Sequence, residues 1–180
     1  MDRYRVKPGQ KVKLAENDPN EKSAWDGDKE SALVRLAQIK VELEQQQEVL
    51  YAESKHKILV VFQAMDTAGK DGTIHAVFSG INPQGVKVAS FKSPTPLELA
   101  HDYLWRVHAQ APGKGELVIF NRSHYEDVLY VRVHKWITPE TCQKRYRHIN
   151  DFERMLTEEG VTILKFFLHI DLAEQKKRLL

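Results

Sequence analysis

The 180-residue sequence contains a single cysteine, Cys142, so a disulfide within the chain is excluded. A chain with one cysteine is typical of a reducing compartment, and we expect a cytoplasmic protein. The sequence also lacks any apolar run of the roughly 18 residues that a membrane span needs, so we expect no membrane partner. Its first residues, MDRYRVKPG, lack the apolar segment of a signal peptide.

Several functional signatures are missing as well. No cluster of cysteine and histidine has the spacing of a zinc site, and no G-x-S-x-G or Ser-His-Asp order stands out. The net charge of +2 argues neither for nor against an anionic partner, so a basic site must come from local clustering. Stretches that interleave basic and stacking aromatic residues, as nucleic-acid binders do, are also lacking. What is present is an ordinary globular composition, 42% hydrophobic and 29% charged, with room for a sizeable core.

The stretch from Ile58 to Thr73 carries the strongest local signal. Its first part, Ile58 to Phe62, is an unbroken apolar run that predicts a strand buried on both faces of a parallel sheet. After a turn of small and polar residues, Gly69 and Lys70 open a segment that predicts a helix. Backbone N–H groups at a helix start, the helix dipole and a lysine together attract anions, so this stretch indicates a phosphate site.

The stretch matches the Walker A pattern, G-x-x-x-x-G-K-S/T, imperfectly. Ala64 stands at the first glycine, Asp71 replaces the hydroxyl residue that binds magnesium, and Asp66 lies inside the loop. One interpretation is a strand-to-helix turn that happens to contain Gly-Lys. The other is a phosphate-binding loop whose metal is held by different ligands, with Asp66 as the obvious carboxylate.

The rest of the chain alternates helices and strands. Residues 1–28 lack periodicity and predict an extended N-terminal arm, whereas residues 29–56 predict a long amphipathic helix with a Gln45–Gln47 break in its apolar stripe. Further strands are predicted at 86–91, 117–120 and 161–170, and further helices at 95–110, 138–160 and from 171 onward. Asp26 or Asp28 can cap the first helix, and capping boxes are predicted for Thr95 with Glu98 and for Asp171 with Glu174. No stop signal ends the last helix before Leu180, so we expect the sequence to be part of a longer protein.

This alternation predicts an α/β fold with a mostly parallel sheet, in which ligands bind at the carboxyl ends of the strands. Cations and carboxylates follow the four predicted strands at this edge. These residues are Asp66, Gly69 and Lys70; Lys92, Pro94 and Thr95; Asn121, Arg122, Tyr125 and Glu126; and Asp171 with the cluster Lys176 to Arg178. Such a set suits phosphoryl transfer, because cations neutralise phosphate oxygens while carboxylates hold magnesium or orient the nucleophile.

The same residues also have purely structural interpretations. Arg122 could pair with Glu126 on the surface, and the cluster Lys176 to Arg178 could be the solvated face of a helix. His124 is better explained by packing or hydrogen bonding than by a role as a base.

Three separated segments, AMDTAGKDG, VASFKSPTPLELAHDYLWR and FNRSHYEDVL, together resemble the polyphosphate kinase 2 family in order and spacing. The resemblance implies a P-loop kinase fold like that of thymidylate kinase, with three α/β/α layers. It also implies phosphoryl transfer between inorganic polyphosphate and nucleotides, with Mg²⁺, or alternatively Mn²⁺, as the metal. The kinase domain would occupy residues 29–180, and the mobile helical lid of the family would lie beyond Leu180.

The resemblance further implies roles for individual residues. Asp66, Lys70, Arg122 and Glu126 are the expected catalytic residues, with Asp66 and Glu126 as metal ligands. Asn121 stands where many members carry aspartate, and Glu126 where asparagine is frequent; Glu126 could supply the missing carboxylate. Both features are similar to the class III subgroup, which phosphorylates AMP and ADP. The residues expected to bind nucleotide or polyphosphate are Ala68, Gly69, Asp71, Gly72, Thr73, Lys92, Asn121, Tyr125, Arg132 and Arg178.

The resemblance thus predicts a homo-oligomeric enzyme that makes ADP or ATP from polyphosphate and binds adenine nucleotides but no nucleic acid. Two alternatives stay open. The first is an ATP-dependent nucleoside monophosphate kinase of similar fold, which differs in its phosphoryl donor. The second is a non-catalytic module that binds anions or nucleic acid, which the carboxylates beside the basic site disfavour.

Overall fold

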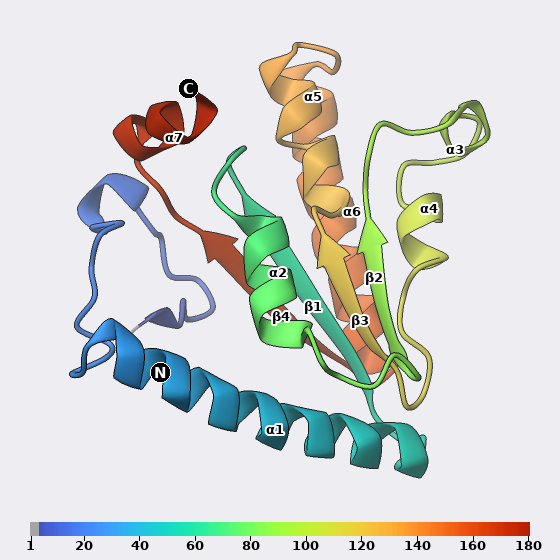
Figure 1. Cartoon of the computed structure of the whole chain (residues 1–180). Coiled ribbons are helices and arrows are strands. Elements are labelled where there is room, and N and C mark those ends of the chain that lie inside the picture. Colours follow the sequence, from blue (N-terminus) through green and yellow to red (C-terminus); the bar gives the residue numbers. More distant parts are fainter. Residues whose placement is uncertain (1–3) are drawn as a thin grey trace.

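The structure, a computed structural model, describes residues 4–180. Its centre is a sheet of four strands, β1 (Lys57–Ala64), β2 (Val86–Ser90), β3 (Leu117–Asn121) and β4 (Val161–Leu168). The strands lie in the order β2-β3-β1-β4, and every neighbouring pair is parallel (Figure 1). The α/β fold and the parallel sheet that the alternation predicts are confirmed, and all four carboxyl ends meet at one edge.

The apolar run at Ile58 to Phe62 forms β1, which lies between β3 and β4. Leu59 and Val61 point to one face of the sheet, and Val60 and Phe62 point to the other. All four side chains are buried, because helices cover both faces at this strand. The strand extends two residues beyond the predicted end, to Ala64, so the loop that follows starts at the sheet edge.

Two helical layers enclose the sheet. On one face, Leu50 of α1 (Lys29–Glu53) and Ile74 of α2 (Lys70–Phe78) pack in one cluster with Val60, Phe62 and Ile119. On the other face lie α4 (Trp105–His108) and α6 (Pro139–Glu158). These two helices supply Val107, Phe152 and Leu156 to a second cluster with Leu59, Val61 and Val118. The molecule therefore has the three α/β/α layers that the family resemblance implies (Figure 1).

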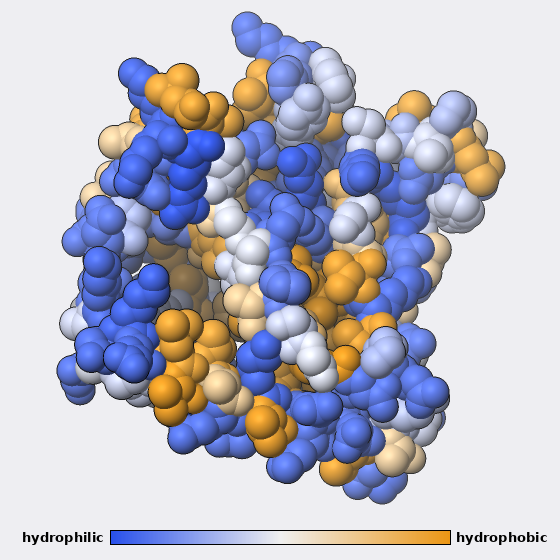
Figure 2. Space-filling view, in the orientation of Figure 1, coloured by the Kyte–Doolittle hydropathy of each residue, from blue (hydrophilic) through white to orange (hydrophobic). Residues whose placement is uncertain are grey.

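Helix α1 begins where the sequence predicts, because the Asp28 side chain accepts a hydrogen bond from the Ser31 N–H. It ends at Glu53, three residues before the predicted end, with Ser54 in the left-handed conformation. The glutamines were expected to interrupt its apolar stripe, yet Gln47 is buried and donates to the Gln84 carbonyl at 2.7 Å. Several apolar residues of α1 are instead exposed, and Figure 2 shows apolar side chains on the face of α1 turned to the viewer.

The helix predicted for 95–110 is wrong in its middle. Thr95 and Glu98 form the predicted capping box, but α3 (Pro96–Leu99) ends after one turn and α4 starts only at Trp105. Between them, the Asp102 side chain accepts a hydrogen bond from the Leu104 N–H at 2.9 Å. An aspartate that bonds its own downstream backbone competes with helix formation, which explains the break.

The remaining elements are short. They are the 3₁₀ turns η2 (Leu14–Glu16) and η3 (His124–Asp127) and the helices α5 (Tyr130–Val133) and α7 (Leu172–Leu179). The side chain of Asp171 caps α7 through the Glu174 N–H, as predicted, whereas the Glu174 carboxylate turns to Arg178 at 2.8 Å. Among residues 4–180, no helix is long and apolar enough to cross a membrane.

Candidate active site

The loop between β1 and α2 has the shape of an anion cradle. Gly69 precedes the helix with a φ of +94°, a left-handed conformation that favours glycine, and Thr67 has a φ of +65°. Lys70 is only 7% exposed, and its Nζ donates to the carbonyls of Ala64 at 3.2 Å and Met65 at 3.4 Å. The lysine thus closes the loop on itself while keeping its charge beside the α2 N-terminus.

Lys70 lies among the charged residues that the sequence predicts for the site. Burial lowers the pKa of its ammonium, and the nearby Arg122 guanidinium lowers it further. The carboxylates of Asp66, Glu126 and Asp71 act in the opposite direction. Two cations and three carboxylates from separate segments therefore interact at one place on the sheet edge.

Polar contacts join the segment after β3 to the segment after β1. The Arg122 guanidinium donates to the Asp66 carboxylate at 3.0 Å, and the Asn121 amide donates to the Asp71 carboxylate at 2.6 Å. Arg122 therefore pairs with Asp66 and not with Glu126, the partner that a purely structural interpretation predicted. The Glu126 carboxylate instead accepts a hydrogen bond from the Gln63 amide at 2.6 Å. Gln63 is a residue of this site that the sequence patterns do not single out, because they place it in a turn of small and polar residues.

Helix α7 closes the site from the side of β4. The Gln175 amide donates to the Asp66 carbonyl at 3.1 Å, and Arg178 donates to the Thr67 carbonyl at 3.0 Å. A Cβ added at Gly69 would lie 3.6 Å from the Arg178 guanidinium, so this arginine sits directly against the loop. Sequence patterns select Arg178 as part of a basic cluster but give no signal for Gln175.

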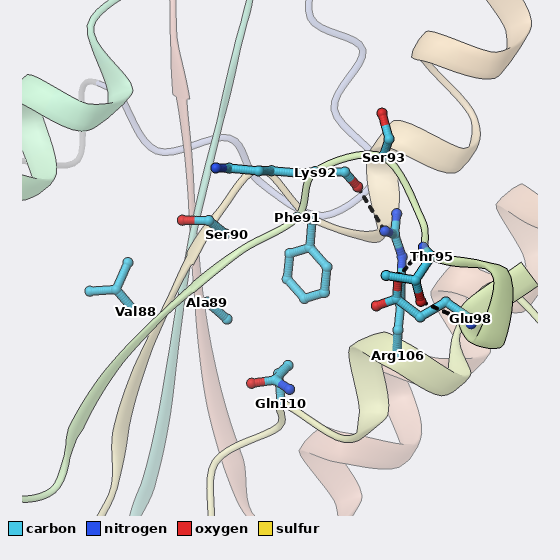
Figure 3. A pocket seen from close by; sticks show the side chains of 10 residues that line it. All are labelled: Val88, Ala89, Ser90, Phe91, Lys92, Ser93, Thr95, Glu98, Arg106 and Gln110. Carbon is cyan, nitrogen blue, oxygen red and sulfur yellow. Dashed lines mark hydrogen bonds between the residues drawn. The ribbon is translucent and has the colours of Figure 1, made fainter.

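Three predicted binding residues make their polar contacts with residues outside this charged group. Arg132 on α5 donates to the Tyr146 hydroxyl at 3.3 Å, and the Tyr125 hydroxyl donates to Glu153 at 2.8 Å. Lys92 accepts a hydrogen bond at its carbonyl from Arg106 at 2.8 Å and lines a cavity of about 390 Å³ beside β2. Figure 3 shows its ammonium pointing away from Arg106. Their substrate contacts stay predictions.

A divalent metal at this site would need oxygen ligands from a bound phosphate in addition to the protein's carboxylates. Among residues 4–180, no group of three histidine, cysteine, aspartate or glutamate side chains is placed to hold a metal ion. Magnesium, however, is commonly bound by one or two carboxylates together with substrate phosphates and water. The carboxylates of Asp66 and Glu126 therefore fit a metal that arrives with phosphate.

Comparisons with known proteins agree with this geometry. The family model described as Polyphosphate kinase 2 (PPK2) matches residues 26–180. An AMP/ADP-polyphosphate phosphotransferase of Meiothermus ruber is 62% identical over 179 residues, which cover 99% of this chain and 67% of the relative. An ADP-polyphosphate phosphotransferase of Rhodopseudomonas palustris is 49% identical over 146 residues, or 74% of this chain and 50% of the relative.

A solved structure extends the likeness to three dimensions. The crystal structure of Polyphosphate Kinase 2 from Arthrobacter aurescens TC1 superposes with a TM-score of 0.92 at 44% identity. The match covers 97% of this chain and 62% of the crystallised chain. The present sequence therefore spans between half and about two thirds of the length of these relatives. Because the family model covers the loop, the sheet and the Arg122 segment alike, the chain belongs to the polyphosphate kinase 2 family.

Proposed function

We propose that this chain transfers phosphoryl groups from inorganic polyphosphate to AMP, ADP or both. The observation that carries the proposal is that two cations, Lys70 at the start of α2 and Arg122 after β3, lie near each other. The carboxylates of Asp66, Asp71 and Glu126 lie beside them. Phosphate groups need the cations, and carboxylates in the same place serve a metal or an acceptor group. The names of the relatives from M. ruber and R. palustris support the substrate class.

The reaction would be an in-line displacement. An oxygen of the nucleotide's terminal phosphate forms a bond to the end phosphorus of polyphosphate, while the bridging P–O bond breaks and a shortened polyphosphate leaves. Lys70 and the loop N–H groups hold the transferring phosphate, and Arg122 neutralises the charge spread over its oxygens. No side chain needs to become a covalent intermediate.

Arg122 now pairs with Asp66 through one N–H donor, so an incoming phosphate can use its other donors or replace the carboxylate. The side chains are exposed to 41% for Arg122 and 72% for Asp66, so their ion pair contributes only about 0–1 kcal/mol. An incoming phosphate with two or more charges can displace the carboxylate at small cost. Asp66 then becomes free to orient the acceptor phosphate or to bind a metal.

Mg²⁺, or Mn²⁺ in its place, is the metal that we propose, held by Asp66 and Glu126 together with phosphate oxygens. Such an ion would neutralise the charge that develops on the phosphate oxygens. We further propose a cytoplasmic protein, since Cys142 is a buried free thiol, and a homo-oligomer, since α1 exposes Leu33, Val34 and Val41. Light scattering of the purified chain measures the oligomeric state.

The function is tested by incubating the chain with Mg²⁺, AMP or ADP, and polyphosphate. The expected product is ADP or ATP, measured by chromatography, and it should not form when chelator removes the metal. A parallel reaction with AMP and ATP as donor is the control. Product from ATP but not from polyphosphate would favour an ATP-dependent nucleoside monophosphate kinase, and nucleic-acid binding without turnover would favour a binding module.

A further inference from the structure

Glu153 on α6 is a carboxylate that collects donors from two other elements. Its Oε1 lies 3.1 Å from His124 Nε2 and accepts a hydrogen bond from the Tyr125 hydroxyl at 2.8 Å. Its Oε2 accepts from Lys165 of β4 at 2.5 Å, and the same ammonium lies 3.0 Å from the Tyr125 hydroxyl. The Glu153 side chain is 12% exposed, so these donors largely replace water around its charge.

The two donors from η3 follow shortly after Arg122 in the chain. His124 and Tyr125 are the second and third residues beyond it, and His124 is buried. Glu153 therefore holds, from the helical layer behind the sheet, the turn that carries a proposed catalytic residue. None of the sequence patterns points to this role. The apolar residues of α6 explain how the helix packs, and Glu153 reads as an ordinary polar residue between them.

The turn needs such an anchor because its backbone is not in a relaxed conformation. Arg122 has a φ of +63°, which costs a residue with a side chain of the order of 1 kcal/mol or more. Its N–H donates to the Phe62 carbonyl at 3.1 Å, which ties the start of the turn to β1. Ser123 is buried, accepts the Tyr125 N–H and donates to Gln63 at 3.3 Å.

The turn is thus fixed at both ends, by β1 before Arg122 and by Glu153 after it. A carboxylate in this place fixes the orientation of its neighbours, because its two oxygens can accept hydrogen bonds from three donors in separate directions. An apolar side chain would fill the same volume without fixing the rotation of His124 and Tyr125.

We infer that Glu153 is a positioning residue that sets the placement of Arg122 through His124 and Tyr125. The inference rests on the proposed phosphotransferase function, since Arg122 is taken to contact the transferring phosphate. Glu153 itself does not touch substrate. Its effect should therefore appear in turnover and depend on Arg122, rather than appear in nucleotide binding.

The test compares Glu153→Gln with wild type in the polyphosphate and ADP reaction. We expect kcat to fall roughly 10- to 100-fold with KM for ADP changed less than about twofold, because misplacing a group in the transition state costs turnover. Tyr125→Phe removes one of the donors with little risk to folding, and it should lower kcat in the same direction by a smaller factor. The matched control is Glu158→Gln on the same helix, where the carboxylate is exposed and pairs with Arg154 at 3.8 Å.

A double variant separates positioning from a general loss of structure. If Glu153 acts through Arg122, adding Glu153→Gln to Arg122→Ala should lower kcat by less than about twofold further. Amide hydrogen exchange gives a readout that needs no turnover: exchange should speed up at residues 123–127 in Glu153→Gln and stay unchanged in β3.

The outcomes distinguish this inference from the proposed function. Wild type without polyphosphate-dependent turnover would overturn the function and, with it, the catalytic part of the inference, whereas the exchange result would still decide the anchoring. Active wild type with Glu153→Gln equally active, or with losses that multiply in the double variant, would overturn the inference alone.

Discussion

Acid should destabilise this protein through Glu153 more than through an ordinary glutamate. Burial raises the pKa of the Glu153 carboxyl, but hydrogen bonds from His124, Lys165 and Tyr125 outweigh it and lower the pKa from 4.5 to about 2. A carboxylate with a lowered pKa stabilises the folded state above its unfolded pKa and loses that contribution as the pH falls. The contribution amounts to about 3 kcal/mol at pH 7 and about 1.4 kcal/mol at pH 3.

The assay is urea unfolding of wild type and Glu153→Gln at several pH values between 7 and 3, followed by tryptophan fluorescence. The difference in free energy of unfolding between the two proteins should shrink by roughly 1.5–2 kcal/mol over this range. Taking the difference removes the titration of the carboxylates that both proteins share. The exposed-site variant Glu158→Gln should stay within about 0.5 kcal/mol of wild type throughout. A difference for Glu153→Gln that is equal at pH 7 and pH 3 would refute the reasoning.

Three further substitutions test the site and the core. Lys70→Met should lower turnover by about 100-fold or more yet leave the melting temperature equal or higher, because burial already disfavours the ammonium; a lowered melting temperature would contradict this. Asp66→Asn should lower turnover strongly without unfolding the protein, and near-normal kcat would remove its assigned role. Phe152→Ala should reduce the free energy of unfolding by about 3–5 kcal/mol in denaturant titrations, since Phe152 is buried in one cluster with Val107 and the strand residue Val61; a loss below about 1 kcal/mol would argue against that packing.

Local sequence signals predicted the helices and strands of this fold well where no other local interaction opposed them. The apolar run of β1 and the capping residues Asp28, Thr95 and Asp171 are short-range features, and the structure has them at the predicted places. The helix predicted for 95–110 failed because Asp102 offers the backbone a turn that a periodicity argument does not weigh.

The candidate site was predictable only in part, because its contacts join distant segments. The rule for parallel sheets brought Asp66, Lys70 and Arg122 to one edge, and the structure places them there. It could not reveal that Gln63 would bind Glu126, since 63 residues separate the two and Gln63 lies outside the motif segments. Glu153 was equally hidden, because its donors come from η3 and β4 and only tertiary structure makes them neighbours.

The two hydrogen bonds of Arg178 on α7 explain why an arginine suits this position better than a lysine. Its Nη1 serves the Thr67 carbonyl and its Nε serves Glu174, which uses two of the five N–H donors of a guanidinium. The remaining donors can face a polyphosphate oxygen while the loop stays held, so anchoring and substrate capture need not compete. A lysine at this position has all its N–H donors on one nitrogen, so it could not bind the Thr67 carbonyl, Glu174 and a phosphate oxygen at the same time as well as arginine does. Sequence libraries that vary the side chain of Thr67 should therefore keep activity more readily than those that exchange Arg178 for lysine, because Arg178 binds the main-chain carbonyl of Thr67 and not its side chain.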